Sequence, residues 1–313
     1  MNQLMTTQNT AMTAVNTFTP ALFDRWVSYV DAGSQKTLET YTKNIRQFAR
    51  YMESHGVTQP QREDVIAFRD SLKADHKSTT IQGYLTSVKL FFSWLSSEGL
   101  YPDVAQHVKA PKTDRSHKKD FLTSRQINKV LSGICREDLQ GLRDYAMISL
   151  MVTTGLRTIS VVNADVSDLR PVGDCTALFY QGKGHTQKDT YVKIAEPVED
   201  AIREYLSARG QLDSDAPLFA SISDRNHGGR MTTRSVSRIA KESLKGAGFN
   251  EKTKTAHSFR HSCATLALMA GAELTQVQQM LDHQNIQTTM IYAHALDRAK
   301  NNTELKVASA IFG

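Results

Sequence analysis

Residues 176–194 read TALFYQGKGHTQKDTYVKI, and this stretch decides the fold class of the carboxyl-terminal part of the chain. Apolar and β-favouring residues at its two ends flank a Gly-Lys-Gly turn, a pattern typical of a β-hairpin. The pattern places Lys183 at the tip of the hairpin and Lys188 in the same hairpin. Because the surrounding segments have helical patterns, the sequence predicts a mainly α domain with a small antiparallel β-sheet.

The segments around this hairpin carry apolar residues at helical spacing. Thr123 and Gln126 form a capping box at the start of one helix. A second helix, through residues 142–154, ends at Gly155, a residue that can adopt the left-handed conformation of a helix cap. Further helices are predicted over residues 198–206, 233–244, 257–270 and 275–281, and with the hairpin they make up a mixed α+β domain over residues 120–313.

A separate all-α domain is predicted over residues 18–108. Apolar residues in this region advance by three or four positions, and glycine or proline interrupts the pattern between helices. Residues 1–17 are polar and uncharged, so we expect them to lie outside the fold. Residues 109–119, KAPKTDRSHKK, are predicted to form an exposed basic linker. The predicted helices cover residues 22–30, 38–52, 65–72 and 84–95.

Composition permits a nucleic-acid partner without establishing one. The 313 residues contain 38 Lys+Arg and 32 Asp+Glu, a formal net charge of +6. The part up to Asp114 carries 12 basic and 11 acidic residues, which leaves 26 and 21 for the rest, so the excess is +1 and +5. Three scattered cysteines fit neither a disulfide framework nor a metal clip, which favours a reducing cytoplasm. No apolar stretch is long enough for a membrane span, and no signal peptide is evident.

Single motifs in the sequence are weak indicators of a site. His257 and Arg260 are three residues apart on a predicted helix, so both could reach one anion, although an ordinary surface pair has the same spacing. His261 would complete a zinc spacing, but no glutamate and no further ligand cluster accompany it. Arg157 follows Gly155 at a point where the next helix can begin, so its guanidinium could bind a phosphate together with the free backbone N–H groups of the helix start. The alternative is an isolated arginine exposed in a loop. Taken alone, Tyr292 is most simply interpreted as a half-buried aromatic residue in a helix.

The order of these motifs along the chain is a much stronger indicator of function than any one motif alone. TGLR ends at Arg157, GKG surrounds Lys183, HSFRH spans residues 257–261, LDH ends at His283, and IYAH contains Tyr292. In this order and spacing the chain resembles the tyrosine recombinases, or phage integrase family, from about residue 18 onward. The resemblance implies an Xer-like two-domain protein. It also implies an amino-terminal SAM-like core-binding domain, a carboxyl-terminal catalytic domain, and the catalytic set Arg157, Lys183, His257, Arg260, His283 and Tyr292.

The resemblance also implies a reaction, metal- and ATP-independent and needing no cofactor. Tyr292 would attack the scissile phosphate and leave a 3′-phosphotyrosine and a free 5′-hydroxyl. Arg157 and Arg260 would hold the non-bridging oxygens, since planar guanidinium forks bind phosphate bidentately. Lys183 would protonate the leaving oxygen. His257 would accept the tyrosine proton or hydrogen-bond the phosphate, and His283 would donate to a non-bridging oxygen.

Two residues depart from the family pattern. Ser160 stands where many relatives carry glutamate, and we expect it to weaken a contact that orients the site. Asp282 stands where glycine is usual, and an acid next to His283 is expected to raise the pKa of that histidine. Neither departure removes a catalytic group. Candidate phosphate contacts outside the catalytic set, each with simple solvation as the alternative, are Lys43, Arg46, Lys112, Lys118, Arg230 and Arg234.

The predicted function is site-specific recombination of double-stranded DNA through a Holliday junction, in integration, excision or dimer resolution. The two domains would clamp the duplex, and the protein would act in the cytoplasm at the nucleoid. The resemblance also implies a homotetramer on synapsed DNA in which subunits exchange the apolar tail that ends the chain; docking of this tail on its own subunit as a terminal helix is the alternative. An accessory recombinase or directionality factor is a further partner that the family allows. The alternatives are a type IB topoisomerase-like enzyme and a catalytically inactive DNA-binding regulator of the same fold.

Overall fold

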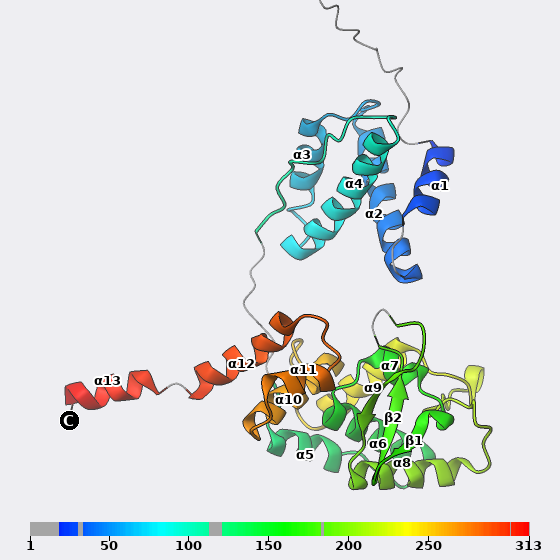
Figure 1. The fold of residues 1–313 in the computed structure, drawn as a ribbon, viewed down its shortest axis with the longest axis vertical. Helices are drawn as coiled ribbons and strands as arrows, with labels where there is room; N and C mark the ends of the chain where they lie inside the picture. Colours follow the sequence, from blue (N-terminus) through cyan, green and yellow to red (C-terminus); the bar gives the residue numbers. More distant parts are fainter. Residues whose placement is uncertain (1–18, 31–33, 113–120, 183–184, 301, 313) are drawn as a thin grey trace, which may run out of the picture. The chain divides into compact units, whose positions relative to one another are not determined.

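The computed structural model describes residues 19–30, 34–112, 121–182, 185–300 and 302–312, with the backbone alone over 294–300. The chain divides into two compact units, Met1–Ser116 and His117–Gly313 (Figure 1). The division falls inside the stretch predicted as a linker. The segment predicted to lie outside the fold, residues 1–17, is outside the described residues, as is most of the linker. In the described ranges no helix is long and apolar enough to cross a membrane.

In its described residues, the first unit contains four helices around an aromatic core. Thr19 caps the first of them by accepting a hydrogen bond from the backbone N–H of Leu22. Trp26 meets Phe91 edge to face at 5.5 Å between ring centroids, and α2 and α3 meet through Phe48 and Phe68 at 5.0 Å. The helices are α1 (Pro20–Tyr29), α2 (Gln35–Ser54), α3 (Arg62–Ser71) and α4 (Ser78–Ser97).

One polar contact lies inside this apolar core. Asn44 of α2 is buried, and its side-chain amide donates to the Ser87 hydroxyl at 3.0 Å and to the Gly83 carbonyl at 3.2 Å. Because a buried amide without partners is costly, these bonds favour one packing register of α2 against α4.

The second unit is larger and mixed. Its main core gathers side chains from most of its helices and from β2 and β3. Helices α6 and α8 pack against each other, and Thr176 of β2 donates a hydrogen bond to Glu199 of α8 at 2.8 Å, which places α8 beside the sheet (Figure 1). The elements are α5 (Ser124–Ser132), α6 (Leu139–Thr154), α7 (Thr158–Asn163), η1 (Val166–Asp168), β1 (Leu169–Val172), β2 (Cys175–Tyr180), β3 (Thr190–Lys193), α8 (Glu196–Arg209), η2 (Asp224–Asn226), α9 (Thr233–Gly246), α10 (Ala256–Met269), α11 (Leu274–Met280), α12 (Ile286–Lys300) and α13 (Thr303–Phe312).

The β-sheet is antiparallel with strand order β1-β2-β3, so the predicted fold class, mainly α with a small antiparallel sheet, is confirmed. The predicted hairpin corresponds to β2 and β3, in which Leu178 pairs with Val192. Strand β1 is additional to the hairpin. Its sequence, LRPV, is short and contains Pro171, which is the composition of an edge strand and gives no alternating apolar signal.

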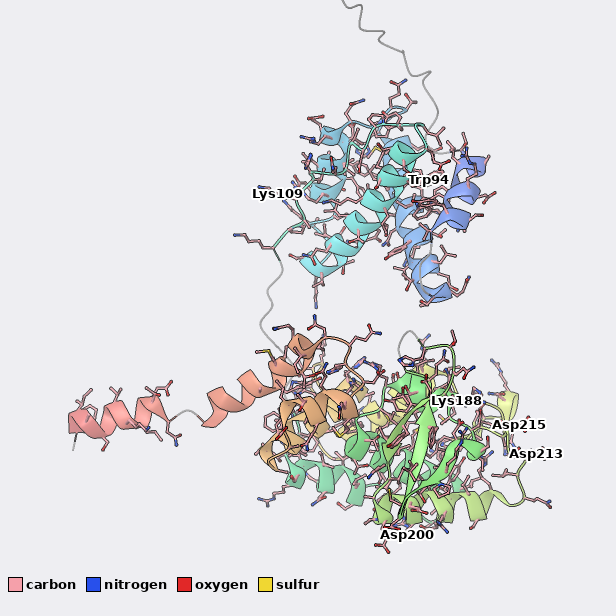
Figure 2. All side chains as sticks on the ribbon, viewed as in Figure 1. Trp94, Lys109, Lys188, Asp200, Asp213 and Asp215 are labelled. Atoms are coloured by element: carbon pink, nitrogen blue, oxygen red, sulfur yellow. The ribbon has the colours of Figure 1, made fainter. Side chains whose placement is uncertain are left out.

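An ion network ties the base of the hairpin to η1. Lys188 (labelled in Figure 2) donates to the carboxylate of Asp165 at 2.6 Å and to that of Asp168, which is 2% exposed. Arg230 reaches the other oxygen of Asp165. Burial raises the pKa of Asp165, but the hydrogen bonds from Arg230 and Lys188 outweigh it, and the pKa lies below its usual value. Lys188 therefore has a structural role in this arrangement.

Replacing Lys188 by methionine should destabilise the protein by about 1 to 3 kcal/mol, because it leaves the Asp168 carboxylate without its nearest cation. This destabilisation is smaller than that expected for breaking a fully buried ion pair, since the Lys188 side chain is 27% exposed. Lys188 also pairs with Asp165, whose pKa is lowered in the folded protein. This carboxyl stabilises the fold above its unfolded pKa, and the contribution is lost as the pH falls through the folded pKa. The difference between the two proteins should therefore shrink below about pH 4.

Chemical denaturation of the full chain at several pH values measures this difference. Lys193→Met, the same change at an exposed position on β3, is the matched control and should alter stability by less than about 0.5 kcal/mol. Equal losses from the two substitutions would contradict the assigned role of Lys188.

Candidate active site

The segment that carries Arg157 turns sharply at the end of α6. Gly155 has the expected left-handed conformation, with φ of +66°. A Cβ atom at this position would also lie 2.6 Å from Cδ2 of Leu281, so a side chain here would force Leu281 to move. The glycine therefore lets the turn before Arg157 pack directly against the end of α11.

Arg260 joins the same two segments from α10. Its Nη1 donates to the Gly155 carbonyl at 2.7 Å, and its Nη2 donates to the Leu281 carbonyl. The residue is 8% exposed, so these bonds also satisfy a guanidinium that burial has taken out of water. One side chain thus fixes the relative positions of the TGLR and LDH motifs.

Arg157 and Arg260 line one pocket of about 390 Å³ together with Asp282 and His283; the remaining residues at its wall are Gln284, Asn285 and Thr288. Burial, together with the charge of Arg157, lowers the pKa of Arg260 to about 10. Two cations that disfavour each other in a partly buried pocket make a site for an anion, because an anion would offset both the burial and the repulsion.

Tyr292 on α12 is buried beside this pocket, with 8% of its surface exposed. Its ring meets the ring of His261 edge to face at 4.8 Å and stacks on that of His283 at 6.2 Å. Burial raises the pKa of Tyr292, while the charges of Arg260 and Arg157 act in the opposite direction. The hydroxyl is therefore protonated near pH 7, and a nucleophilic role requires a group that accepts its proton.

His283 is neutral in this site. Burial lowers its pKa to about 4, and the charges of Arg260 and Arg157 contribute in the same direction. Asp282 acts in the expected direction but is outweighed, so the expectation of a raised pKa for His283 is wrong. Its Nδ1 lies 2.8 Å from the hydroxyl of Thr289, which orients the ring. A neutral imidazole keeps one N–H for donation to an oxygen of a bound anion.

The other predicted catalytic residues differ in what the structure shows. Lys183 lies outside the described residues. His257 is in the first turn of α10, three residues before Arg260, and its side chain is exposed whereas that of Arg260 is buried. Ser160, the first departure from the family pattern, is buried on α7.

Two residues of this region were missed as members of the site. Tyr180, the last residue of β2, is buried, and burial with the charge of Asp282 raises its pKa to about 12. The charges of Arg260 and Arg157 act in the opposite direction. His261, considered above only for a zinc spacing, is buried and packs on the ring of Tyr292. Tyr180 has no local signal in the sequence, and the HSFRH motif that contains His261 does not indicate its contact with Tyr292, because both contacts depend on which elements meet.

The candidate phosphate contacts are spread over both units. Lys43 and Arg46 are exposed on α2 and line a groove of about 570 Å³ against α1. Arg234 is exposed in the first turn of α9, whereas Arg230 donates to the carbonyls of Val162 and Ala164 in addition to its ion pair with Asp165. Lys112 is exposed, and Lys118 lies outside the described residues. All six remain predictions.

The geometry supports one kind of chemistry best. A buried tyrosine hydroxyl lies next to a pocket whose two guanidinium groups can hold an anion, and a neutral histidine can donate to it. These are the groups needed to attack a phosphodiester and to stabilise the charge that develops on its oxygens.

Comparison with known proteins agrees with this chemistry. Residues 120–299 match the Phage integrase family, and residues 22–99 match the Phage integrase, N-terminal SAM-like domain. Tyrosine recombinase XerD of Oceanobacillus iheyensis is 32% identical over 268 residues, which cover 83% of this chain and 88% of the relative. The relative and the family matches agree on a recombinase.

Solved structures show the same fold. XerH site-specific recombinase bound to palindromic difH substrate, in a post-cleavage complex, has a TM-score of 0.73 at 19% identity and covers 93% of this chain and 84% of its own. A lambda integrase tetramer bound to a Holliday junction has a TM-score of 0.66 at 16% identity and covers 86% and 75%. The chain therefore belongs to the phage integrase family of tyrosine recombinases, the enzymes of site-specific recombination that cleave and rejoin DNA strands.

Proposed function

We propose that Tyr292 is the nucleophile of this recombinase. Its hydroxyl oxygen attacks the scissile phosphorus, the bond to the 5′-oxygen breaks, and a 3′-phosphotyrosine and a 5′-hydroxyl result. His257 accepts the tyrosine proton, and Lys183 supplies a proton to the leaving oxygen. Attack by a 5′-hydroxyl of another strand reverses these steps, and the phosphotyrosine linkage conserves the energy of the broken bond, so rejoining needs no ATP.

Arg157 and Arg260 bind the non-bridging oxygens in this proposal, and His283 donates a further hydrogen bond. The observation that carries the assignment is the pocket lined by both guanidinium groups and His283, with the ring of Tyr292 stacked on His283 beside it. Preorganised cations at the place where charge develops are the largest contribution to catalysis of this type.

The substrate in this proposal is double-stranded DNA carrying a specific site, and two duplexes recombine through a Holliday junction. The relative named XerD, together with the XerH complex and the lambda integrase tetramer on a Holliday junction, supports this choice. The biological role is integration, excision or dimer resolution at the nucleoid, with or without an accessory recombinase or directionality factor.

Sequencing the DNA that becomes covalently attached to the protein tests site specificity. We expect the trapped fragments to share one short inverted-repeat sequence, and a plasmid carrying two copies to recombine. Relaxation of supercoiled plasmids without any site dependence would instead indicate a type IB topoisomerase-like enzyme. Binding to one sequence without adduct formation would indicate an inactive regulator.

The contacts to DNA outside the pocket are proposed to come from both units. Lys43 and Arg46 on α2 would contact phosphates from the amino-terminal unit, Arg234 and Arg230 from the catalytic unit, and Lys112 and Lys118 from the linker. Such contacts weaken with salt because each releases counterions from the DNA.

The end of the chain is proposed to mediate assembly of a homotetramer. Among the residues that the structure describes in α13, none is buried, although Leu305, Val307, Ile311 and Phe312 are large, apolar and 52% to 84% exposed. An apolar helix face that is not covered within its own chain is suited to a neighbouring subunit. We therefore propose that each subunit docks this tail on the next.

Removing residues 307–313 should weaken assembly of the tetramer on DNA by at least about tenfold, because burying Ile311 or Phe312 contributes about 1.5 to 3 kcal/mol each. Binding of one protomer to a half-site should change by less than about twofold. Sedimentation of the DNA complexes measures both quantities.

A double variant, Ile311→Ser with Phe312→Ser, keeps the chain length and should reproduce the truncation. Tetramers that form equally well without the tail would refute its role in assembly.

A further inference from the structure

Asp282 holds an unusual backbone conformation in the centre of the site. It follows the end of α11 with φ of +50°, and it is the one non-glycine residue with positive φ in the described part of the chain. Its N–H donates to the Gln279 carbonyl at 3.0 Å. Positive φ is uncommon for residues other than glycine, although aspartate is among those that adopt it most readily, so the contacts of this side chain are of interest.

The Asp282 side chain contacts Arg157. The Asp282 carboxylate accepts from Nη1 of Arg157 at 3.2 Å, and the Asp282 backbone carbonyl accepts from Nη2 at 3.2 Å. Any residue at this position would offer the carbonyl, so the guanidinium is held in place without the carboxylate. What the aspartate adds is a negative charge on the anion-binding face of the arginine.

The position of this charge is closely defined by the hairpin. A Cβ atom on Gly182 would lie 3.2 Å from Oδ2 of Asp282, so the carboxylate sits against the last described residue before the hairpin tip. Its side chain is only 15% exposed, and the charge acts on the pKa of both Tyr180 and His283. Water therefore screens it weakly, and it faces the same pocket as the two arginines.

We propose that the Asp282 carboxylate is an internal competitor of the scissile phosphate for the guanidinium of Arg157. In the free protein it occupies one donor and offsets one of the two positive charges. When DNA binds, the phosphate takes over that donor and is repelled by the nearby carboxylate. The proposal rests on the phosphate-binding role of Arg157 given above. Its consequence is a recombinase that cleaves more slowly than its catalytic set allows.

Asp282→Asn tests the proposal, because asparagine tolerates positive φ and removes only the charge. On a suicide substrate built from the trapped site, single-turnover cleavage at saturating protein should be on the order of tenfold faster than in the wild type. In a Tyr292→Phe background, in which the complex stays non-covalent, the Kd for the same duplex should fall several-fold. Asp282→Gly should change both quantities in the same direction.

The matched control is Asp224→Asn, the same chemical change at an exposed position on η2. It should leave cleavage within about twofold of the wild type, which separates the pocket charge from net charge. Thermal melting of each protein verifies that it is folded. If Asp282→Asn does not fold, the cleavage and affinity of Asp282→Gly test the proposal instead.

Three results would overturn the proposal. Slower cleavage in both Asp282 variants would mean that the carboxylate positions Arg157 for catalysis. A gain with glycine alone would assign the effect to backbone strain, and unchanged cleavage and affinity in both variants would exclude competition. If the wild-type protein forms no adduct at all, the catalytic assignment fails instead, and the affinity measurement alone decides whether Asp282 competes with DNA.

Discussion

Tyr292→Phe should abolish covalent protein–DNA adducts on a suicide substrate while leaving DNA affinity within about twofold of the wild type. The substitution removes only the hydroxyl, so the ring contacts with His261 and His283 persist and the helix keeps its place. Without the oxygen nucleophile no bond to phosphorus can form, and denaturing electrophoresis of labelled DNA measures the loss directly.

The matched control comes from the same site. Tyr180 is also buried near Arg157 and Arg260, so Tyr180→Phe removes a second hydroxyl from the same surroundings. We expect this variant to form adducts. An adduct that survives Tyr292→Phe, or one that disappears in Tyr180→Phe alone, would transfer the nucleophilic role to another residue.

Arg260→Lys should reduce the rate of cleavage by about 10² to 10³, the cost of losing one preorganised donor to a developing negative charge. Lysine keeps the positive charge but cannot bridge the carbonyls of Gly155 and Leu281 while it also donates to phosphate. Single-turnover cleavage at saturating protein measures the chemical step separately from affinity.

The control for this prediction is another buried arginine. Arg143 of α6 is 4% exposed, donates to the Ala220 carbonyl and pairs with Asp144, and it does not line the anion pocket. Arg143→Lys should lower the melting temperature. Its rate of cleavage, measured where the protein is folded, should fall by less than about threefold. Equal losses of cleavage in both variants would show that general destabilisation, and not phosphate binding, explains the result for Arg260.

Local patterns were enough to predict the elements that carry the site. The capping box at Thr123, the left-handed Gly155 and the hairpin flanking Lys183 are each encoded by a short local stretch of sequence. The family and the function followed from the order of the motifs, and comparison with known proteins confirmed both.

Contacts between distant elements were not predictable in the same way. Tyr180 and His261 belong to the site because β2 and α10 bring them there, and no spacing in the sequence records that approach. The lowered pKa of His283 also results from contacts between elements that are distant in the sequence. Its sequence neighbour Asp282 suggested an increase, whereas burial and two arginines from other segments determine the actual direction.

Charge patterns alone also gave limited information about DNA contacts. Arg230 and Lys188 are both basic residues near the predicted site, yet each is engaged by the carboxylate of Asp165. Because a sequence shows cations but not their partners, it cannot distinguish an arginine that contacts phosphate from one that stabilises the fold.

The bonds of Arg260 have a further consequence for how this fold can diverge. They join the active site to carbonyls 105 and 21 residues away along the chain, at the two points where the motifs meet. The connection directly after α8, at residues 210–212, supplies no residue to the anion pocket. A lineage can therefore gain an inserted module there without changing the chemistry, which makes motif order a more durable record of ancestry than motif spacing.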